Sequence, residues 1–503
     1  MVNTFEYDFS QQQNSVWKGK TSFSTGLYID GKFVDGAEGK TIDVTNPADG
    51  KVFAKVSEAT AKDVDLAVQA AHKAFKTVWG LRFPGSQRGK LLMKLADLME
   101  QNADELAALE SLDNGKAFAT AKGFDVQQAA ETIRYYGGWC DKHHGKTIEV
   151  DEHKLAYTRN EPFGVVGQII PWNFPLLMFA WKLGPALATG NCIILKPSEF
   201  TPLTAIRMAH MIQEAGFPPG VVNILTGYGA TAGSAISSHM MIDKVAFTGS
   251  TLVGRTVLKA AADSNLKNVT LELGGKSPNI IFDDADLEQA IKWSAFGIYF
   301  NHGQCCCAGS RVYVQEGVYD TFMQKFTEHV RALKVGDPFH PETFQGPQVS
   351  KVQFDRIMGY IQKGKDEGAT VHLGGEQHGE EGYYIQPTIF TDAKPGMTIV
   401  KDEIFGPVVV VIKFKDEADI IEMANDSMYG LAAAVFSRDI SRALKTAHDL
   451  GAGTVWVNQY NKLHYQVPFG GYKQSGIGRE LGEYALANYT NVKAVHVNLT
   501  AEL

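Results

Sequence analysis

Short apolar segments alternate with helical patterns between residues 164 and 263, and this alternation limits the possible folds more than any other feature. The apolar segments have the composition of strands buried on both faces, and they lie at 165–170, 191–197, 221–225 and 244–248. Residues at helical spacing follow them, for example at 201–214 and 254–263. Strands that alternate with helices predict an α/β fold with a parallel, doubly wound sheet. Ligands of such sheets bind at the carboxyl ends of the strands.

A second series of predicted strands and helices extends from about residue 277 to residue 470. Its strands are expected at 279–282, 408–414, 431–436 and 453–457, and its helices at 287–300 and 321–333. A chain of 503 residues is too long for one core, so two or three domains are expected.

The remaining segments are predicted individually. Amphipathic helices are predicted at 61–79 and 86–112, and a hairpin with an Asp-Gly turn at 27–34. Alternating residues at 147–158 predict an exposed hairpin, and an edge strand is expected at 495–499. Residues 1–25 are rich in Gln, Asn and Ser, which predicts a loosely held arm.

The charge balance and the N-terminus narrow the class of protein. Lys and Arg number 48 against 56 Asp and Glu, which gives a net charge of −8 and argues against a nucleic-acid partner. The N-terminus has no pattern of a secretory or transit peptide. No stretch of 18 uninterrupted apolar residues predicts a membrane span. We therefore expect a cytoplasmic protein that does not bind membranes.

Three of the five cysteines are adjacent, at Cys305, Cys306 and Cys307. Metal sites normally need spaced pairs of cysteines, so no metal site is predicted. A disulfide between neighbours is strained, and unpaired cysteines indicate a reducing compartment. Two interpretations remain, namely small core residues or a nucleophilic thiolate in a Gly-lined site.

Two glycine patterns could contact a nucleotide. Gly227 and Gly229 follow a predicted strand, but their pattern is one residue off G-x-G-x-x-G and is also typical of an ordinary strand–helix turn. Gly249 and Ser250 are predicted at a helix N-terminus, where free N–H groups favour a pyrophosphate.

Four polar residues at predicted strand ends each allow two interpretations. Lys196 and Glu199 could bind ribose hydroxyls or form a surface ion pair. Glu272 lies between leucines, so burial would raise its pKa toward that of a general base, although strand alternation favours an outward position. Asn173 could donate to an oxyanion or serve only as a turn residue.

Seven segments together resemble the NAD(P)-dependent aldehyde dehydrogenases, in particular the cytosolic and mitochondrial tetrameric ones. They are PWNFP at 171–175, LKPSE at 195–199, FTGS at 247–250, LELGGKS at 271–277, GQCCCA at 303–308, EIFGP at 403–407 and PFGGYKQSG at 468–476. They occur in the order of the family, and the resemblance covers about residues 25–500.

The resemblance implies a role for each matching residue. Cys306 matches the nucleophile, Glu272 the general base, and Asn173 with the Cys306 N–H the oxyanion hole. The residues implied to bind the cofactor are Ile170, Trp172, Lys196, Glu199, Gly229, Gly249, Ser250, Glu403 and Phe405. The implied substrate tunnel consists of Phe174, Leu177, Met178, Trp181, Phe300, Cys305, Asn461, Leu463 and Phe469.

The resemblance also implies the architecture. We expect two Rossmann-like domains and a small β oligomerisation domain. The NAD-binding domain would comprise residues 25–143 and 163–274, and the catalytic domain residues 275–474. The oligomerisation elements would be 144–162 and 488–503, and residues 1–24 the N-terminal arm. A homotetramer is expected.

The implied activity is oxidation of a small aldehyde to the acid with NAD, with NADP as a possible second cofactor. A CoA-acylating dehydrogenase, a cysteine hydrolase and a non-catalytic structural or binding protein are the alternatives. The presence of Glu272 disfavours the first, and the cysteine and base together disfavour the last. A carboxylate at Glu199 favours NAD. Lys462 near the tunnel mouth disfavours a quaternary-ammonium aldehyde.

Overall fold

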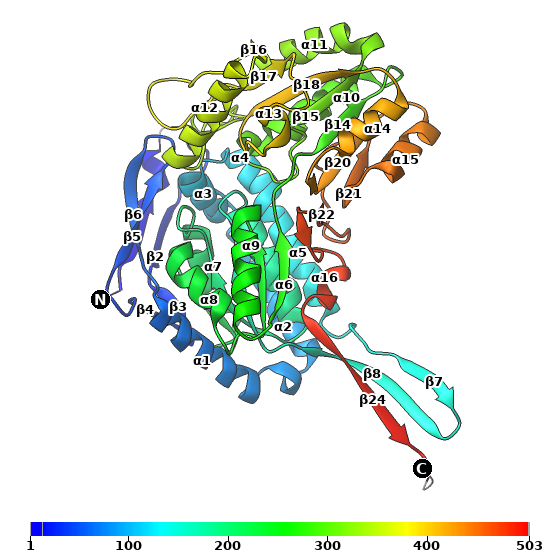
Figure 1. The fold of residues 1–503 in the computed structure, drawn as a ribbon. Coiled ribbons are helices and arrows are strands. Elements are labelled where there is room, and N and C mark those ends of the chain that lie inside the picture. The colour runs from blue at the N-terminus through cyan, green and yellow to red at the C-terminus, as the bar shows by residue number, and fades with distance from the viewer. Residues whose placement is uncertain (1, 13, 501–503) are drawn as a thin grey trace.

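The computed structural model describes residues 2–12 and 14–500, which form two α/β lobes and a projecting β arm (Figure 1). The expected fold class is confirmed, because each lobe is built on its own mostly parallel sheet. Within the described residues, no helix has both the length and the apolar character needed to cross a lipid bilayer.

The first sheet has eight strands in the order β23-β13-β12-β9-β10-β11-β3-β4. The parallel strands are β9 (Val165–Ile169), β10 (Cys192–Lys196), β11 (Val222–Ile224), β12 (Lys244–Thr248) and β13 (Asn268–Glu272). The hairpin of β3 (Leu27–Ile29) and β4 (Lys32–Val34) closes one edge, and β23 (Gly476–Ile477) closes the other. Register pairs Ile169 with both Lys196 and Phe247, and Thr248 with Glu272. The residues that follow these strands therefore meet at one edge of the sheet.

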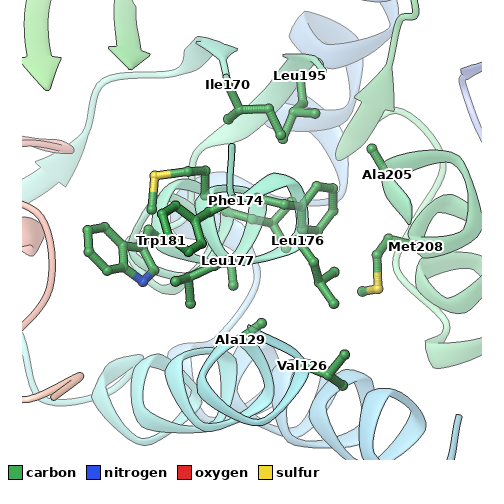
Figure 2. Packing of buried hydrophobic residues seen from close by; sticks show 14 of the residues in the cluster. Val126, Ala129, Ile170, Phe174, Leu176, Leu177, Trp181, Leu195, Ala205 and Met208 are labelled. Atoms are coloured by element: carbon green, nitrogen blue, oxygen red, sulfur yellow. The ribbon is translucent and has the colours of Figure 1, made fainter. Parts of the chain in front are cut away.

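Helices of this lobe cover the sheet and one another. They are α1 (Ala61–Thr77), α2 (Gly85–Gln101), α3 (Ala103–Asn114), α4 (Phe118–Thr120), α5 (Gln127–Trp139), α6 (Pro175–Ala188), α7 (Leu203–Ala215), α8 (Ser234–Ser238), α9 (Thr251–Asp263) and α16 (Tyr484–Ala487). Figure 2 shows side chains of α6 packed between Val126 and Ala129 on one side and the strand-end residues Ile170 and Leu195 on the other. All residues of α6 are buried, so this helix is the centre of the lobe.

The second sheet has seven strands in the order β16-β17-β18-β15-β14-β20-β21. They are β14 (Pro278–Ile281), β15 (Arg311–Gln315), β16 (Thr370–Leu373), β17 (Thr388–Thr391), β18 (Val408–Phe414), β20 (Ala432–Phe436) and β21 (Thr454–Val457), and only β16 is antiparallel to its neighbour. The helices are α10 (Leu287–Tyr299), α11 (Tyr319–Arg331), α12 (Lys351–Asp366), α13 (Thr398–Lys401), α14 (Glu417–Asn425) and α15 (Ile440–Asp449).

The arm is a three-stranded antiparallel sheet of β7 (Thr147–Asp151), β8 (Lys154–Pro162) and β24 (Thr490–Asn498). It projects from the first lobe, and the C-terminus lies at its end (Figure 1). The hairpin and the final strand predicted from the sequence are both confirmed, although β24 begins earlier than expected. Residues 501–503 lie outside the described residues.

The remaining elements are short. They are η1 (Phe9–Gln11), η2 (Gly80–Arg82), η3 (Ala121–Val126), η4 (Gly229–Gly233), η5 (Phe300–Gly303), η6 (Glu316–Val318), β1 (Thr4–Asp8), β2 (Lys20–Ser24), β5 (Thr41–Asn46), β6 (Lys51–Ser57), β19 (Tyr429–Gly430) and β22 (Tyr472–Lys473). The elements η3 and η4 are π-helical turns.

Two expectations from the sequence are wrong. The N-terminal segment is not a loose arm, because β1 pairs with β2 and the rings of Phe5, Phe9 and Phe23 are buried. The polar composition of the segment concealed these aromatic anchors. The helix expected at 86–112 is two helices, and the chain turns at Asn102, whose side chain caps the carbonyl of Leu98. The apolar period continues across this turn, so the sequence does not reveal it.

Candidate active site

A cavity of about 1000 Å³, including its mouth, lies at the carboxyl edge of the first sheet and receives residues from both lobes. It contains all three residues predicted to be catalytic and all nine predicted to line a substrate tunnel. Of the predicted cofactor residues it contains Trp172, Gly249, Ser250, Glu403 and Phe405. The fold thus brings together predicted residues that are up to 297 positions apart, from Trp172 to Phe469.

The triple cysteine lies on a loop with an unusual backbone. Asn301, His302 and Gly303 have φ values of 50°, 60° and 72°, so three successive residues are left-handed just before the cysteines. Such a conformation is costly for non-glycine residues and persists only where the surrounding structure holds it. Cys305 and Cys307 are buried, and their sulfur atoms lie 3.5 Å apart. Cys306 is the partly exposed thiol of the three.

Contacts among the three thiols set their protonation. Hydrogen bonds from Cys306 and Cys307 hold the pKa of Cys305 well below its usual range. The same contact with Cys305 raises the pKa of Cys306, and burial adds to this effect. The contact between the thiols thus shifts the pKa values of Cys305 and Cys306 in opposite directions.

Glu272 ends β13, and its carboxyl group is buried, with no hydrogen-bond partner for either oxygen among the described residues. Burial raises its pKa well above the usual range, and the negative charge of Glu480 raises it further. Glu480 itself forms a buried ion pair with Lys182, at 2.5 Å between Oε1 and Nζ. The predicted rise in the pKa of Glu272 is confirmed, and its outward-facing alternative is excluded.

Asn173 lies between β9 and α6 and is also buried. Its side-chain Nδ2 donates to the Gln304 carbonyl at 3.1 Å, immediately before the cysteines. The amide of Asn173 and the loop that carries the three cysteines are thus joined directly. An amide donor next to a thiol is the arrangement needed to stabilise an oxyanion on a carbon that the sulfur attacks.

The side of the cavity formed by the second lobe carries Glu403 and Phe405. Glu403 Oε1 accepts from the Gly275 backbone N–H at 3.0 Å, and burial raises the pKa of Glu403 to about 7. A Cβ on Gly274 would lie 2.2 Å from Glu403 Oε2, so only glycine allows this approach. Phe405 packs edge-on against Trp172, with 5.2 Å between ring centroids.

The N-terminus of α9 forms another part of the cavity wall. Ser250 is its N-cap, and its Oγ accepts from the Val253 N–H. Thr248 Oγ1 is buried there with no hydrogen-bond partner among the described residues. The predicted position of Gly249 and Ser250 at a helix N-terminus is confirmed.

Four other predicted residues lie outside this cavity. Lys196 is buried at the end of β10, and its Nζ donates to the Gly227 carbonyl at 2.8 Å and lies 3.5 Å from Glu199 Oε2. Ile170 donates its N–H to the Lys196 carbonyl. Gly229 begins the π-helical turn η4, which agrees with the interpretation of its glycine pattern as an ordinary strand–helix turn.

Sequence reasoning missed three residues of the cavity wall, Phe124, Gln353 and Arg356. Gln353 and Arg356 lie one turn apart on α12, and Gln353 Nε2 donates to the Phe405 carbonyl at 2.9 Å. Phe124 projects from η3 and packs on Phe300, with ring centroids 5.1 Å apart. Their side-chain types carry no distinctive pattern, so only the placement of their helices could identify them.

No cluster of three or more His, Cys, Asp or Glu side chains in the described part of the chain is arranged to hold a metal ion.

Sequence comparison relates the whole chain to known proteins. Residues 33–495 match the sequence model described as the aldehyde dehydrogenase family. The chain is 68% identical to an aldehyde dehydrogenase of Agaricus bisporus, over 97% of this chain and 98% of that protein. It is 54% identical to a mitochondrial aldehyde dehydrogenase of Homo sapiens, over 95% of this chain and 92% of that protein.

Structural comparison gives the same result. The fold is similar to that of an aldehyde dehydrogenase from Bacillus cereus solved as its NAD⁺ complex, with a TM-score of 0.94. Their sequences are 52% identical, and the match covers 95% of this chain and 97% of the other.

Proposed function

Since this chain belongs to the aldehyde dehydrogenase family, we propose that it oxidises an aldehyde to the carboxylic acid with NAD, through a covalent adduct on Cys306. The observation that carries the proposal is the presence, in one cavity, of the partly exposed Cys306 thiol, the Asn173 amide and the unpartnered Glu272 carboxyl. A nucleophile, an oxyanion donor and a base are the groups that such an oxidation needs.

The residues of the cavity fit a dinucleotide. Ser250 and Gly249 offer a helix N-terminus to a pyrophosphate, and the unpartnered Thr248 hydroxyl lies beside them. Glu403 would bind the nicotinamide ribose, with Phe405 against the ring, and Trp172 would contact the pyrophosphate. Lys196, Glu199, Gly229 and Ile170 would hold the adenosine half. A carboxylate at Glu199 binds a 2′-OH and repels a 2′-phosphate, so we propose NAD as the main cofactor.

In the first step the Cys306 thiol gives its proton to a water molecule, which leaves the thiolate. Attack of the Cys306 sulfur on the aldehyde carbonyl gives a tetrahedral thiohemiacetal, whose oxyanion accepts hydrogen bonds from the Asn173 amide and the Cys306 N–H. NAD, when bound here, supplies the acceptor for the hydride whose loss converts the thiohemiacetal to a thioester. Glu272, in its ionised form, then takes a proton from water as the water attacks this thioester. The C–S bond breaks, which releases the acid and the Cys306 thiolate.

The tunnel favours small aliphatic or aromatic aldehydes. Its wall contains the rings of Phe124, Phe174, Trp181, Phe300 and Phe469. An aromatic lining leaves little room for a bulky polyene. Lys462 adds a positive charge near Leu463, which disfavours a cationic aldehyde.

The alternatives are weaker. Transfer of the acyl group to coenzyme A does not need a buried base such as Glu272. A purely structural role needs neither Cys306 nor Glu272. Hydrolysis of activated esters by the same thiol requires no cofactor, so it predicts no NADH formation.

The domain division and the assembly state are also proposals. We infer that the first sheet with its helices binds NAD, and that the second lobe carries the catalytic loop. The β arm exposes Val150, Val492 and Leu499 to 53%, 70% and 60%, and such apolar exposure supports a role in a homotetramer. A cytoplasmic location remains a prediction, since the Homo sapiens relative is named mitochondrial.

Replacement of Cys306 by Ala tests the function directly. We expect NADH formation from propanal to disappear while NAD binding, measured by titration calorimetry, is unchanged. The matched control is Cys140→Ala, because Cys140 is also a buried cysteine but does not line the cavity. Turnover near that of the wild type in C306A would overturn the proposal.

A further inference from the structure

Lys116 is a fully buried cation next to the candidate active site, and no role described so far accounts for it. It lies between α3 and α4. Its Nζ donates to the Asn173 backbone carbonyl at 3.2 Å and lies 4.3 Å from the centroid of the Phe174 ring. It also forms a short ion pair with Asp125 and lies 3.7 Å from Glu110 Oε1. A buried ammonium is costly unless its position supplies good partners, and all of these partners are buried.

The Asn173 carbonyl is held from two sides. Besides Lys116, the Asn301 side-chain Nδ2 donates to it at 2.9 Å. The same Asn301 nitrogen lies 3.1 Å from the Gln304 carbonyl, which also accepts from Asn173 Nδ2. Two donors on one carbonyl fix the peptide from which the Asn173 side chain projects. Lys116 is the charged donor, and charge-assisted hydrogen bonds are roughly twice as strong as neutral ones.

The ion pair with Asp125 extends this contact to the wall of the tunnel. Asp125 is part of the π-helical turn η3, and the residue before it is Phe124, which lines the cavity. Turns of this type occur frequently at functional sites. Lys116 thus joins the segment that carries Asn173 to the turn that carries Phe124.

We propose that Lys116 is a positioning residue of the reaction, which holds the Asn173 amide in line with the developing oxyanion and anchors the Phe124 wall through Asp125. The inference rests on the proposed function, because it assigns Asn173 to the oxyanion. A misplacement of about 1 Å can cost on the order of 10²-fold in rate. Loss of the amide itself should cost roughly 10²–10³-fold.

The test is a double-mutant cycle on the hydride step, in which the rate of the first NADH burst with propanal is measured. We expect Lys116→Met to slow the burst about 10- to 100-fold and to leave the Kd of NAD unchanged. We expect Asn173→Ala to slow it roughly 10²–10³-fold. In the Asn173→Ala background, Lys116→Met should change the rate less than about twofold. The effects of two substitutions on the activation free energy add when the residues act independently, but not when both residues serve the same function.

Lys122→Met is the matched control. Lys122 lies on η3, the turn that carries Asp125, but its side chain is exposed and pairs with Asp104 at 2.8 Å. It should behave as the wild type in both rate and melting temperature. Burial raises the pKa of Glu110 and Asp125, and Lys116 opposes this effect, so both acids should accept protons once the lysine is gone.

A folding defect is separated from the proposed role by Lys116→Met/Asp125→Asn, which removes both charges of the ion pair. If its melting temperature is restored while the burst stays slow, the positioning role is supported. If either variant folds and its burst is as fast as that of the wild type, the proposal is wrong. If both variants unfold, Lys116→Arg is tested instead, because arginine keeps the positive charge but places its N–H donors elsewhere. A folded Lys116→Arg variant with a slow burst supports the proposal, and one with a burst as fast as that of the wild type overturns it.

The double-mutant cycle distinguishes failure of the Lys116 inference from failure of the oxyanion assignment of Asn173. Full additivity of Lys116→Met and Asn173→Ala overturns the inference and leaves the proposed function intact. An unchanged burst in Asn173→Ala alone overturns the oxyanion assignment, and the inference with it.

Discussion

Replacement of Glu272 by Gln should slow the enzyme and stabilise it at the same time. Glutamine has the same shape but cannot take a proton from water, so hydrolysis of the thioester loses its base. A general base contributes roughly 10²–10⁴-fold, and steady-state turnover should fall by that factor. The steps before hydrolysis do not need this role, so a first burst of NADH should remain and become easier to see.

The effect on stability follows from the buried carboxyl. Its pKa is about 4.5 in an unfolded chain and is raised well above this value in the fold, because the group is enclosed and has no hydrogen-bond partner. Between these two values the unfolded chain releases a proton that the folded chain keeps. The stability of the wild type therefore falls as the pH rises through this window, by about 1.4 kcal/mol for each unit of pKa difference that has been crossed.

Glutamine does not titrate, so E272Q escapes this loss. The melting temperature of E272Q minus that of the wild type should be larger at pH 7.5 than at pH 5.5. Scanning calorimetry of both proteins at both pH values measures this difference. Stopped-flow absorbance of NADH with propanal gives the burst and the steady state in one record. Unchanged steady-state turnover would remove Glu272 from its role, and a melting difference independent of pH would show that its carboxyl is not held protonated by the fold.

Two further outcomes are expected from other parts of the chain. Glu199→Gln should raise the ratio of kcat/KM for NADP to kcat/KM for NAD about tenfold. The reason is that the variant removes a negative charge that repels the 2′-phosphate by about 1.4 kcal/mol. An unchanged ratio in steady-state assays would show that the 2′-phosphate does not bind beside Glu199. Phe9→Ala should lower the free energy of unfolding by about 3–5 kcal/mol, because the ring is fully buried against Trp17 and Phe339. Urea titration measures this change, with Phe200→Ala as the control because the Phe200 ring is exposed. Equal urea midpoints for the two variants would show that the N-terminal segment is loosely held after all.

The fold class and most of the site residues could be predicted from the sequence because the signals are local. Strands such as Cys192–Lys196 are continuous apolar runs, and the cavity lies where parallel strands end. The order of seven motifs then indicated which polar residues belong together. The N-terminal segment was misjudged for the same reason, since its polar composition outweighed three rings whose burial depends on distant partners such as Phe339.

The tertiary structure decided what no local pattern encodes. Cys306 differs from its two neighbours only because Cys305 and Cys307 turn their sulfur atoms toward each other and leave one thiol partly exposed. The alternation of β13 favoured an outward Glu272, and only the packing of both lobes encloses it. Lys116 had no signal at all, since a lysine in a polar stretch normally lies at the surface. Its burial depends on the Asp125 carboxylate and on the Asn173 carbonyl, which only the folded chain brings to the same ammonium group.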